Sequence, residues 1–318
     1  MDSSDPTAVT VSALRPGQHV DGVFACSRKD RLFTRSGAPY LALELRDRSG
    51  TIQARAFQDA DALAGRFERG ELVRVSGRVE RFRDQPVVEV IDIARVGGDS
   101  GGSGGSGGSG ASGPGLDPAD FLPTAYRDLD ELDGFLEHLA GEVHDRRFRA
   151  FLEALLADVS LRAELRRAPC TRSGHHAYLG GLLEHMVAVA TLAYEVCQLH
   201  PRLNQDLLLT AALVHDLGRT REFTYGAEIG LTDEGRLLGH LVLGSQMVSS
   251  RAGDLDDERR LALLHCVLTH HGTAGVPGGR FGSVEALTLY RLNAVDAGIK
   301  GAFEHGLGLE GAARSEAH

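Results

Sequence analysis

The spacing of hydrophobic positions changes partway along this chain. Before residue 97, apolar side chains tend to alternate with polar ones, which is typical of half-buried β-strands. Turn-forming residues such as Ser36-Gly37 separate the alternating segments. The predicted strands cover 19–26, 39–45, 51–57, 72–82 and 87–94, and a short helix is expected at 59–67. Five strands with a helix after the third is the order of an OB-fold barrel.

Beyond residue 115, apolar positions recur every three or four residues, which is the period of an α-helix. The predicted helices cover roughly 128–140, 145–167, 178–199, 205–216, 236–252, 255–271 and 284–299. No strand-like pattern interrupts them. The fold class predicted from the sequence is therefore a multidomain chain, with an N-terminal all-β OB-fold barrel and a C-terminal all-α helical bundle.

A run of glycine and serine separates the two patterns. Residues 97–115 read GGDSGGSGGSGGSGASGPG, which cannot bury apolar surface and predicts a flexible linker. Natural and engineered linkers share this composition, so its origin stays open. With 318 residues, the chain is long enough for two domains. We expect a barrel domain at 1–96, the linker at 97–115 and a helical domain at 116–318.

Charge and cysteine content narrow the possible surroundings of the protein. The net charge is −10, but residues 1–99 are electrically balanced, so the helical part carries the whole deficit. An acidic domain suits a site that holds cations. The four cysteines have no paired spacing, which indicates free thiols rather than disulfides or a zinc site. Neither a leader peptide nor an apolar run near 18 residues is evident, so we expect a cytoplasmic protein.

Histidines near the ends of predicted helices are the strongest candidates for chemistry. His215 and Asp216 end the apolar helix LLLTAALVHDLGR. A neighbouring His and Asp can bind one divalent cation, and the Asp can bridge to a second. Three other predicted helices carry further candidates, namely His185, His240 and the pair His270 and His271. One buried histidine is more often a core residue than a ligand, but four such elements in this order predict a metal site.

The order H…HD…H…HH…D resembles the HD superfamily of metal-dependent phosphohydrolases. Together with the barrel, the chain is more closely similar to the YhaM-type 3′→5′ exoribonucleases, which join an OB-fold to an HD domain. The resemblance spans about 19–299, apart from the linker. Segments that carry it include GAPYLALELRDRSGTIQARAF (37–57), HHAYLGGLLEHMVAVA (175–190), LNQDLLLTAALVHDLGR (203–219), GRLLGHLVLGSQM (235–247) and FGSVEALTLYRLNAVDA (281–297).

This resemblance implies Mn²⁺ or a similar divalent ion, two per site, and hydrolysis of single-stranded RNA to nucleoside 5′-monophosphates. It implies that the two ions activate water and hold the scissile phosphate. It also implies a homo-oligomer. No membrane partner is expected, because no apolar run approaches 18 residues. The implied ligands are His185, His215, Asp216, His240, His270 and His271. Arg219 stands where relatives usually carry Lys; a phosphate contact and a solvated helix charge are equally compatible with its position. We treat His215, Asp216 and Arg219 as the candidate catalytic residues.

The last expected ligand departs from the family pattern. Relatives end with two aspartates three residues apart, and the first closes the metal site. Aligned on Asp296, that ligand position is Asn293. Asp296 itself, one helical turn further on, is also a candidate metal ligand, which would reach the site only if the helix shifts. An amide oxygen can coordinate a cation but brings no negative charge, so metal binding should weaken. Three outcomes stay open: altered metal preference with activity kept, reduced activity, or a domain kept for binding only.

The barrel carries a basic and aromatic segment in its first predicted hairpin. OB-folds bind single strands with such surfaces. The candidate nucleic-acid-binding residues are Arg28, Lys29, Arg31, Phe33, Arg35 and Tyr40. Phe57 and Phe82 are either additional stacking residues or core.

Two other functions compete with the exoribonuclease. An HD phosphohydrolase of small nucleotides would not need a remote single-strand grip, so the barrel disfavours it. A catalytically weakened single-strand-binding protein would not need to keep six of the seven expected ligands. Single-stranded DNA remains an alternative substrate, and the sequence does not decide the metal.

Overall fold

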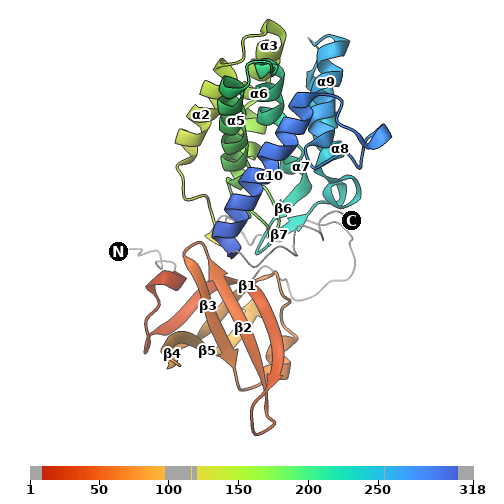
Figure 1. The fold of residues 1–318 in the computed structure, drawn as a ribbon. Helices are drawn as coiled ribbons and strands as arrows, with labels where there is room; N and C mark the ends of the chain where they lie inside the picture. The colour runs from red at the N-terminus through yellow and green to blue at the C-terminus, as the bar shows by residue number, and fades with distance from the viewer. Residues whose placement is uncertain (1–8, 97–115, 117–119, 254, 307–318) are drawn as a thin grey trace. The chain divides into compact units, whose positions relative to one another are not determined.

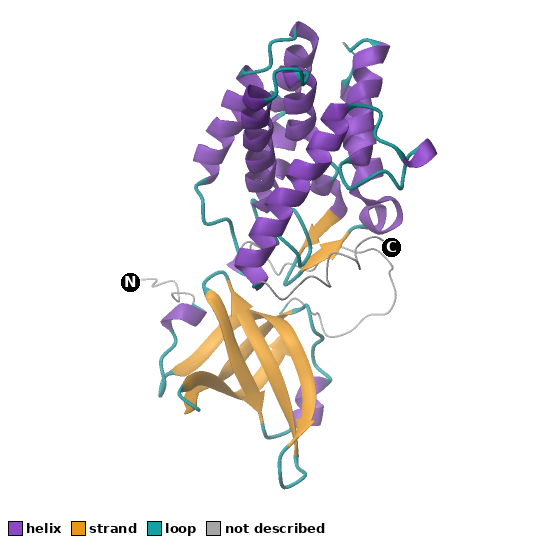
Figure 2. Ribbon diagram, in the orientation of Figure 1, coloured by secondary structure: helices purple, strands orange, loops and turns teal. Residues whose placement is uncertain are grey.

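A computed structural model describes residues 9–96, 116, 120–253 and 255–306, so the predicted linker 97–115 lies outside the described residues. Contacts between residues divide the chain into two compact units. One comprises Met1–Pro123 with Thr224–Gly230, and the other comprises Thr124–Phe223 with Leu231–His318. The first unit is built mainly of strands and the second mainly of helices (Figures 1 and 2).

The strands of the first unit form a closed barrel in the order β1-β2-β3-β5-β4. Only β3 and β5 pair in parallel; the other neighbours are antiparallel. The strands are β1 (His19–Phe33), β2 (Pro39–Asp47), β3 (Gly50–Ala56), β4 (Leu72–Phe82) and β5 (Gln85–Arg95), with α1 (Ala60–Ala64) between β3 and β4. A 3-10 turn, η1 (Val11–Ala13), precedes them. This arrangement confirms the predicted OB-fold barrel.

The barrel buries alternate side chains, as the sequence pattern requires. In β2, Leu41, Leu43 and Leu45 point into the core and are almost fully buried. The first strand is longer than predicted. Its register shifts between Cys26 and Arg28, and the prediction ended at that point. A β-bulge of this kind interrupts the alternation and bends the strand. Beyond the bulge, β1 continues along β2 to Phe33.

The second unit is a bundle of helices. Its elements are α2 (Leu129–Gly141), α3 (Arg146–Leu156), α4 (Val159–Arg167), α5 (Gly181–Leu199), α6 (Gln205–Val214), α7 (Arg219–Glu222), α8 (Asp233–Arg251), α9 (Asp257–Thr269), η3 (Pro277–Gly279) and α10 (Val284–His305). The segment 145–167 was predicted as one helix but forms α3 and α4. Asp158 separates them, because its carboxylate accepts a hydrogen bond from Leu161 N and begins a new helix.

Short polar residues begin most helices of the bundle. Each side chain accepts a hydrogen bond from a backbone N–H of the first turn, which would otherwise lack a partner. The residues that cap helices in this way are Asp128, Asp145, Asp158, Asn204, Thr232, Asp256 and Ser283. These caps set the helix starts that the hydrophobic period alone leaves uncertain.

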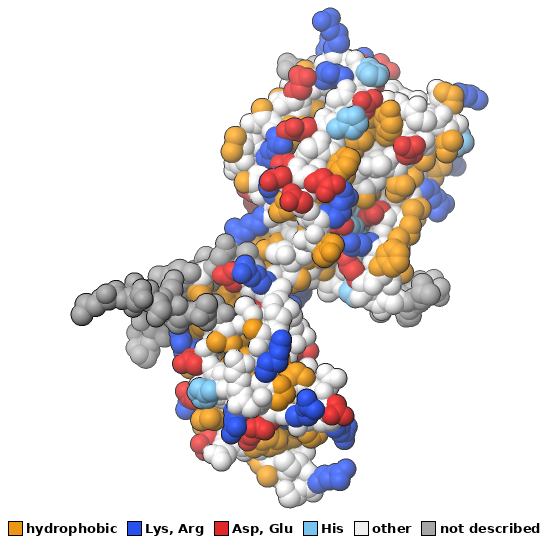
Figure 3. All heavy atoms as spheres, turned by 90° about the vertical axis from the view of Figure 1, so that its left-hand side faces the viewer, with side chains coloured by type: hydrophobic (Ala, Val, Ile, Leu, Met, Phe, Trp, Pro, Cys, Tyr) orange, Lys and Arg blue, Asp and Glu red, His pale blue; other side chains and the backbone are white. Residues whose placement is uncertain are grey.

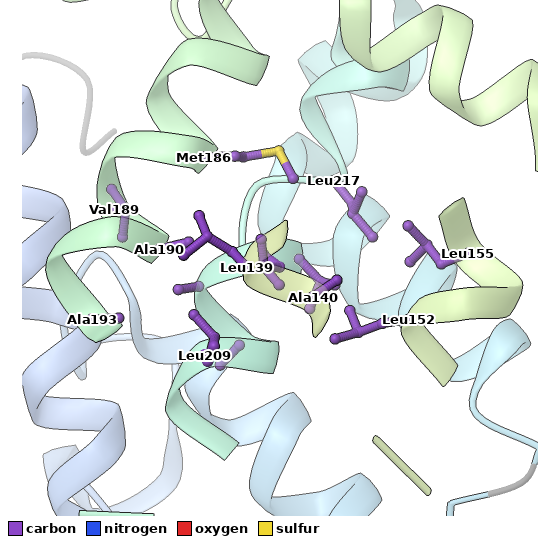
Figure 4. Close-up of a cluster of buried hydrophobic side chains, with 14 of the residues drawn as sticks. Leu139, Ala140, Leu152, Leu155, Met186, Val189, Ala190, Ala193, Leu209 and Leu217 are labelled. Atoms are coloured by element: carbon purple, nitrogen blue, oxygen red, sulfur yellow. The ribbon is translucent and has the colours of Figure 1, made fainter. Parts of the chain in front are cut away.

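Helix α5 lies at the centre of the bundle and packs against α2, α6 and α10. Its Met186, Val189, Ala190 and Ala193 belong to the buried apolar cluster drawn in Figure 4. By length and composition alone α5 is apolar enough to cross a membrane. Half of it is buried inside the bundle, so its composition is also that of a core helix.

A short hairpin and a four-residue helix were not predicted. Strands β6 (Phe223–Tyr225) and β7 (Ile229–Leu231) pair with each other within a region expected to be wholly helical. Three residues are too few to show an alternating pattern. Helix α7 is similarly too short to show a helical period, yet it carries Arg219 and Glu222.

Charged side chains of both signs are intermixed on the face shown in Figure 3. Many arginines on the surface lie beside a carboxylate, as in the pairs Arg66–Asp92 at 2.6 Å and Arg221–Glu234 at 2.7 Å. An exposed pair of this kind contributes only ~0–1 kcal/mol. The charges with larger consequences are those buried among the histidines of the bundle.

Candidate metal centre

The predicted site residues converge because several helices end or bend at the same place. His215 and His270 are the residues at which α6 and α9 end. His185 lies in α5 near its start. Helix α8 is interrupted at Gly239, which has φ of +69° and lies next to His240. Backbone with positive φ favours glycine, which explains the residue type at 239. The regular helix is therefore broken immediately before His240.

A close approach of two backbones brings His240 to the His215–Asp216 turn. A Cβ atom placed on Gly218 would overlap the carbonyl oxygen of His240 and the amide nitrogen of Gly244. Only glycine therefore fits at residue 218. The sequence HDLGR thus contains both the candidate ligands and the residue that lets α8 pack against them.

The Asp216 carboxylate lies between two groups of histidine nitrogens. Its Oδ1 is 3.2 Å from His270 Nε2 and 3.6 Å from His240 Nε2. Its Oδ2 is 3.7 Å from both His185 Nε2 and His215 Nε2. Donor atoms of Asp216, His240, His270 and His271 lie within 4.8 Å of one another, and so do those of His185, His215 and Asp216. One carboxylate oxygen thus faces each group.

Four of the imidazoles are oriented through Nδ1. A carbonyl or carboxylate oxygen accepts hydrogen bonds, so an Nδ1 beside it carries the proton and leaves Nε2 with a lone pair. His215 Nδ1 is 2.9 Å from Ala212 O, and His270 Nδ1 is 2.6 Å from Val267 O. The other two contacts are His185 Nδ1 with Asp296 Oδ2 at 2.6 Å and His240 Nδ1 with Glu222 Oε1 at 3.3 Å.

The arrangement fits divalent cations better than it fits an apolar core. His185 Nε2 and His215 Nε2 are 3.2 Å apart. Both carry a lone pair, because Nδ1 of each ring holds the proton. Two facing lone pairs repel unless a cation lies between them. His270 Nε2 is buried and has no hydrogen-bond partner, which is costly for a polar atom. Neutral imidazoles and a carboxylate are ligands that divalent metals prefer.

Burial and neighbouring charges keep three candidate ligands, His215, His240 and Asp216, in the protonation states that metal binding needs. Burial lowers the pKa of His215 to about 3 and also lowers the pKa of His240. Burial alone would raise the pKa of Asp216, but Arg219 and His215 hold it well below its ordinary value. The imidazoles of His215 and His240 are therefore neutral and the Asp216 carboxylate is ionised at neutral pH.

Arg219 is buried rather than solvated. Its Nη1 donates to Glu222 Oε2 at 3.0 Å, and its Nε lies 3.4 Å from Asp216 Oδ1. Its Nη2 is 3.5 Å from His271 Nε2. The position of Arg219 is therefore not that of a solvated helix charge. Its guanidinium lies beside the candidate ligand group of Asp216, His240 and His270.

Asn293 and Asp296 have different surroundings. Asn293 is buried, and its Nδ2 donates to His270 O at 3.2 Å. Asp296 Oδ2 accepts from His185 Nδ1 and lies 3.0 Å from His176 Nε2. The Asp296 carboxylate is thus on the Nδ1 side of His185, opposite the nitrogen that faces Asp216. Burial would raise the pKa of Asp296, but hydrogen bonds from His176 and His185 lower it.

Sequence reasoning missed three residues in the loop between α4 and α5. Cys170 is fully buried, and its Sγ is 3.5 Å from His175 Nε2 and 3.7 Å from Asp216 Oδ2. Donor atoms of Cys170, His175 and His185 lie within 4.8 Å of one another. The adjacent His175 and His176 were a visible signal, since both precede the helix that carries the candidate ligand His185. Cys170 had none, because its neighbours in space are histidines rather than other cysteines.

The barrel exposes several aromatic rings beside arginines. Phe33 is 61% exposed, and Phe57 and Phe82 are 46% and 43% exposed, so none of the three is core. The Arg55 guanidinium lies 3.9 Å from the centre of the Phe82 ring, and Tyr40 stacks on Phe57 at 5.3 Å. Cationic and aromatic groups of this kind suit stacking with bases.

The predicted basic residues of the barrel are not equally free. Lys29 Nζ donates to Ala64 O at 2.8 Å and to Phe67 O at 2.5 Å, so its charge is engaged within the barrel unit. Arg28 lies 2.5 Å from the Asp30 carboxylate, and Arg31 lies 2.6 Å from Asp61 while stacking on Phe33 at 5.0 Å. Arg35 is exposed at the tip of the β1–β2 hairpin.

Comparison with known families assigns both units. An OB-fold nucleic acid binding domain matches residues 25–94, and an HD domain matches residues 182–297. The second match includes the predicted ligands from His185 to Asp296. The protein thus combines an OB-fold with an HD domain, as the sequence predicted.

Curated relatives make the assignment more specific. The chain is 27% identical over 260 residues to a protein named 3′-5′ exoribonuclease YhaM from Oceanobacillus iheyensis, covering 81% of this chain and 77% of the relative. It is 28% identical over 260 residues to the protein of the same name from Bacillus subtilis, covering 81% and 78%. The resemblance to YhaM-type proteins is confirmed, and the chain is homologous to them over most of its length.

Solved structures add little to this assignment. The second OB-fold domain of replication protein A from Methanococcus maripaludis covers 30% of this chain and 100% of its own, with 17% identity and a TM-score of 0.25. The barrel assignment rests on its strand order and on the family match instead.

Proposed function

We propose that this protein is a metal-dependent 3′→5′ exoribonuclease that hydrolyses single-stranded RNA to nucleoside 5′-monophosphates. The observation that carries the proposal is the Asp216 carboxylate, which has one oxygen toward each of two histidine groups. Homologues named exoribonuclease supply the reaction class and the polarity. An OB-fold on the same chain supplies a means of holding a single strand.

In this proposal two divalent cations, Mn²⁺ or a similar ion, occupy the two histidine groups. His185, His215 and Asp216 Oδ2 would hold one; Asp216 Oδ1, His240, His270 and His271 would hold the other. When bound, such ions supply Lewis-acid chemistry by activating water near neutral pH and neutralising charge on the scissile phosphate. An amide oxygen at Asn293 can add a neutral ligand, whereas Asp296 contributes through His185.

The side chains of the site have complementary tasks. Asp216 would offer one oxygen to each metal position, and His215 would offer Nε2 from a ring whose Nδ1 lies beside Ala212 O. Arg219 carries a charge that its carboxylate neighbours maintain, since Asp216 and Glu222 keep its pKa raised against the effect of burial. We assign Arg219 to neutralise an oxygen of the phosphate, and Glu222 to orient both Arg219 and His240.

The barrel would hold the RNA upstream of the cleaved end. We assign this task to the exposed Arg31, Phe33 and Arg35 and to the half-buried Tyr40, with Phe57 and Phe82 added because their rings are exposed. Arg28 would contribute at the edge and Lys29 least, because its ammonium group already donates to two carbonyls. Single-stranded DNA can bind the same rings, because stacking does not depend on the sugar.

The remaining parts of the proposal concern the whole protein. The barrel (1–96) and helical domain (116–318) would act as separate modules joined by the linker 97–115. Four free cysteines suit the reducing cytoplasm. A homo-oligomer is proposed from the resemblance to YhaM-type proteins, and no membrane partner is proposed.

The test is degradation of 5′-labelled single-stranded RNA in Mn²⁺. The wild type is compared with a His215→Ala/Asp216→Ala double variant, with an EDTA sample, and with a His138→Ala control on another helix. Products that shorten from the 3′ end, in the wild type and the control only, support the proposal. RNA that is bound but never shortened in Mn²⁺, Mg²⁺, Co²⁺ or Ni²⁺ refutes the proposal. That result would indicate a single-strand-binding protein whose catalytic activity was lost with the aspartate that Asn293 replaces. Hydrolysis of mononucleotides alone indicates a small-nucleotide phosphohydrolase.

A further inference from the structure

Cys170 occupies a position that the exoribonuclease proposal leaves unexplained. It belongs to the loop between α4 and α5 and is fully buried. Its Sγ lies 3.7 Å from Asp216 Oδ2, the same carboxylate oxygen that is 3.7 Å from His185 Nε2 and His215 Nε2. A thiol therefore lies beside one of the two candidate metal positions. The same site lacks one expected negative charge, because Asn293 stands where relatives carry the last aspartate ligand.

The loop that carries Cys170 is held in place by its own hydrogen bonds. Cys170 N donates to His176 O at 3.1 Å, which closes the loop on itself. Thr171 Oγ1 donates to His175 O at 2.7 Å and accepts from Gly174 N at 2.9 Å. His176 has φ of +50°, a backbone conformation that a residue with a side chain rarely adopts without support. The sulfur therefore has a defined position beside Asp216.

The far end of the loop is anchored to α10 and α5. His176 N donates to Glu304 Oε2 at 3.0 Å, and the His176 ring lies 3.0 Å from Asp296. A Cβ atom on Gly181, the first residue of α5, would overlap His176 O. The loop is thus packed directly against the start of the helix that carries His185.

Four of the six separations among Cys170 Sγ, His185 Nε2, His215 Nε2 and Asp216 Oδ2 are close to the edges of a four-coordinate site. With sulfur at ~2.3 Å and nitrogen or oxygen at ~2.0–2.2 Å from a cation, tetrahedral edges are roughly 3.3–3.7 Å. The observed separations are 3.2 Å for His185 Nε2 to His215 Nε2 and 3.7 Å for Asp216 Oδ2 to His185 Nε2, His215 Nε2 and Cys170 Sγ. His175 Nε2 is next to the sulfur at 3.5 Å.

We propose that Cys170 is a thiolate ligand of the metal position formed by His185, His215 and Asp216, and that it makes this position favour a thiophilic divalent cation such as Zn²⁺ or Co²⁺. As the metal–sulfur bond forms, the thiol S–H bond breaks and the proton leaves to solvent. The thiolate restores the negative charge that Asn293 does not bring. A soft donor strengthens the binding of Zn²⁺ and Co²⁺ more than that of Mn²⁺. This inference builds on the metal site of the proposed function but not on the substrate.

The first test is the absorption spectrum of the full-length protein loaded with Co²⁺. A cysteine thiolate bound to Co²⁺ gives an intense sulfur-to-metal charge-transfer band in the near ultraviolet, whereas nitrogen and oxygen ligands do not. We expect the band in the wild type and in Cys197→Ala, which removes another buried thiol from α5. We expect it to be absent in Cys170→Ala and in Cys170→Ser, which keeps the size of the side chain.

The second test measures affinity by competition with a chromophoric chelator. Removing the sulfur should weaken Zn²⁺ binding by at least roughly tenfold, the lower end of the effect seen when residues that support metal ligands are removed. Mn²⁺ binding should change less, so that the preference for Zn²⁺ over Mn²⁺ falls in Cys170→Ala but not in Cys197→Ala. Equal losses for the two metals would contradict the selectivity.

X-ray absorption on the Zn²⁺-loaded wild type avoids dependence on variants that fold poorly. One sulfur neighbour at ~2.3 Å supports the proposal, and a shell of nitrogen and oxygen only overturns it. These readouts are separate from RNA cleavage. Exonuclease activity without a sulfur ligand would leave the proposed function intact and refute this inference. A sulfur ligand in a protein that cleaves no RNA would support this inference and refute the proposed function.

Discussion

Replacement of Asp296 by asparagine tests whether a residue outside the metal ligands controls metal binding. Asp296 Oδ2 accepts from His185 Nδ1 at 2.6 Å and contacts His176 Nε2 at 3.0 Å. These contacts keep the proton of His185 on Nδ1 and its lone pair on Nε2, toward Asp216. The substitution Asp296→Asn preserves the shape of the side chain but removes its charge. The new amide can also turn its NH₂ toward His185 and favour the wrong tautomer.

The size of the effect follows from the two hydrogen bonds. A bond to a charged group contributes ~1.5–3 kcal/mol, and a neutral one ~0.5–1.5 kcal/mol, so each bond loses about 1 kcal/mol. Two bonds give about 2 kcal/mol, or roughly 30-fold in affinity. This value falls within the ~10–100-fold range typical for residues that orient metal ligands.

The assay is a Co²⁺ or Mn²⁺ titration of the metal-free protein, followed by kcat/KM on single-stranded RNA at saturating metal. We expect Asp296→Asn to bind metal roughly 30-fold more weakly and to recover much of its activity when metal is saturating. Asp257→Asn, an exposed carboxylate on α9, is the matched control. Unchanged metal affinity in Asp296→Asn, in a protein that folds normally, would refute the argument that His185 is oriented through Nδ1.

Three further predictions follow from particular contacts. Asn293→Asp loses the hydrogen bond that Asn293 Nδ2 donates to His270 O, so the metal-free protein should be less stable by ~1–3 kcal/mol. The added charge should at the same time tighten metal binding. Thermal unfolding with EDTA and with metal measures both effects, and equal shifts in the two conditions would contradict the prediction. Phe57→Ala and Phe82→Ala should each weaken RNA binding by ~1–3 kcal/mol in fluorescence anisotropy with a His215→Ala/Asp216→Ala background, and unchanged binding would exclude these rings from the RNA surface. Asp145→Ala removes the cap of α3 and should cost ~0.5–2 kcal/mol of unfolding free energy. A hydrogen bond from Arg259 lowers the pKa of Asp145 below its ordinary value. The stabilising contribution of Asp145 is therefore present above that ordinary value and is lost as pH falls through the folded-state pKa. Urea titrations at pH 7 and at a series of acidic pH values should show the stabilities of the two proteins converging as pH falls.

The barrel shows how far local patterns reach. Alternating apolar residues and turn sequences were enough to predict five strands and their order. The second half of β1 was missed, because the bulge between Cys26 and Arg28 breaks the alternation. Whether Phe57 and Phe82 are core or surface was also undecided, since both possibilities are compatible with the ends of strands. Burial depends on which strands close the barrel, and a local pattern does not contain that information.

The helical unit shows the same limit at its site. Histidines at helix ends, and an HD pair after an apolar run, could be read directly as candidate ligands. Asp296 was expected near the metal, yet its oxygen contacts Nδ1 of His185. The other ring nitrogen of His185, Nε2, is the one that faces Asp216. Cys170 was assigned no role, because a thiol 46 residues away from Asp216 in sequence leaves no spacing motif.

The sequence by itself determined the residue types that can bind cations, the periods of the strands and helices, and the resemblance to a family. Those properties are local, or are carried by the order of motifs along the chain. Only the tertiary structure decided which nitrogen of each imidazole faces Asp216, which carboxylate lies behind His185, and that a thiol lies among the donors. Coordination and hydrogen bonding act over about 2–4 Å, and only the packing of α5, α6, α8, α9 and the loop before α5 brings these atoms that close.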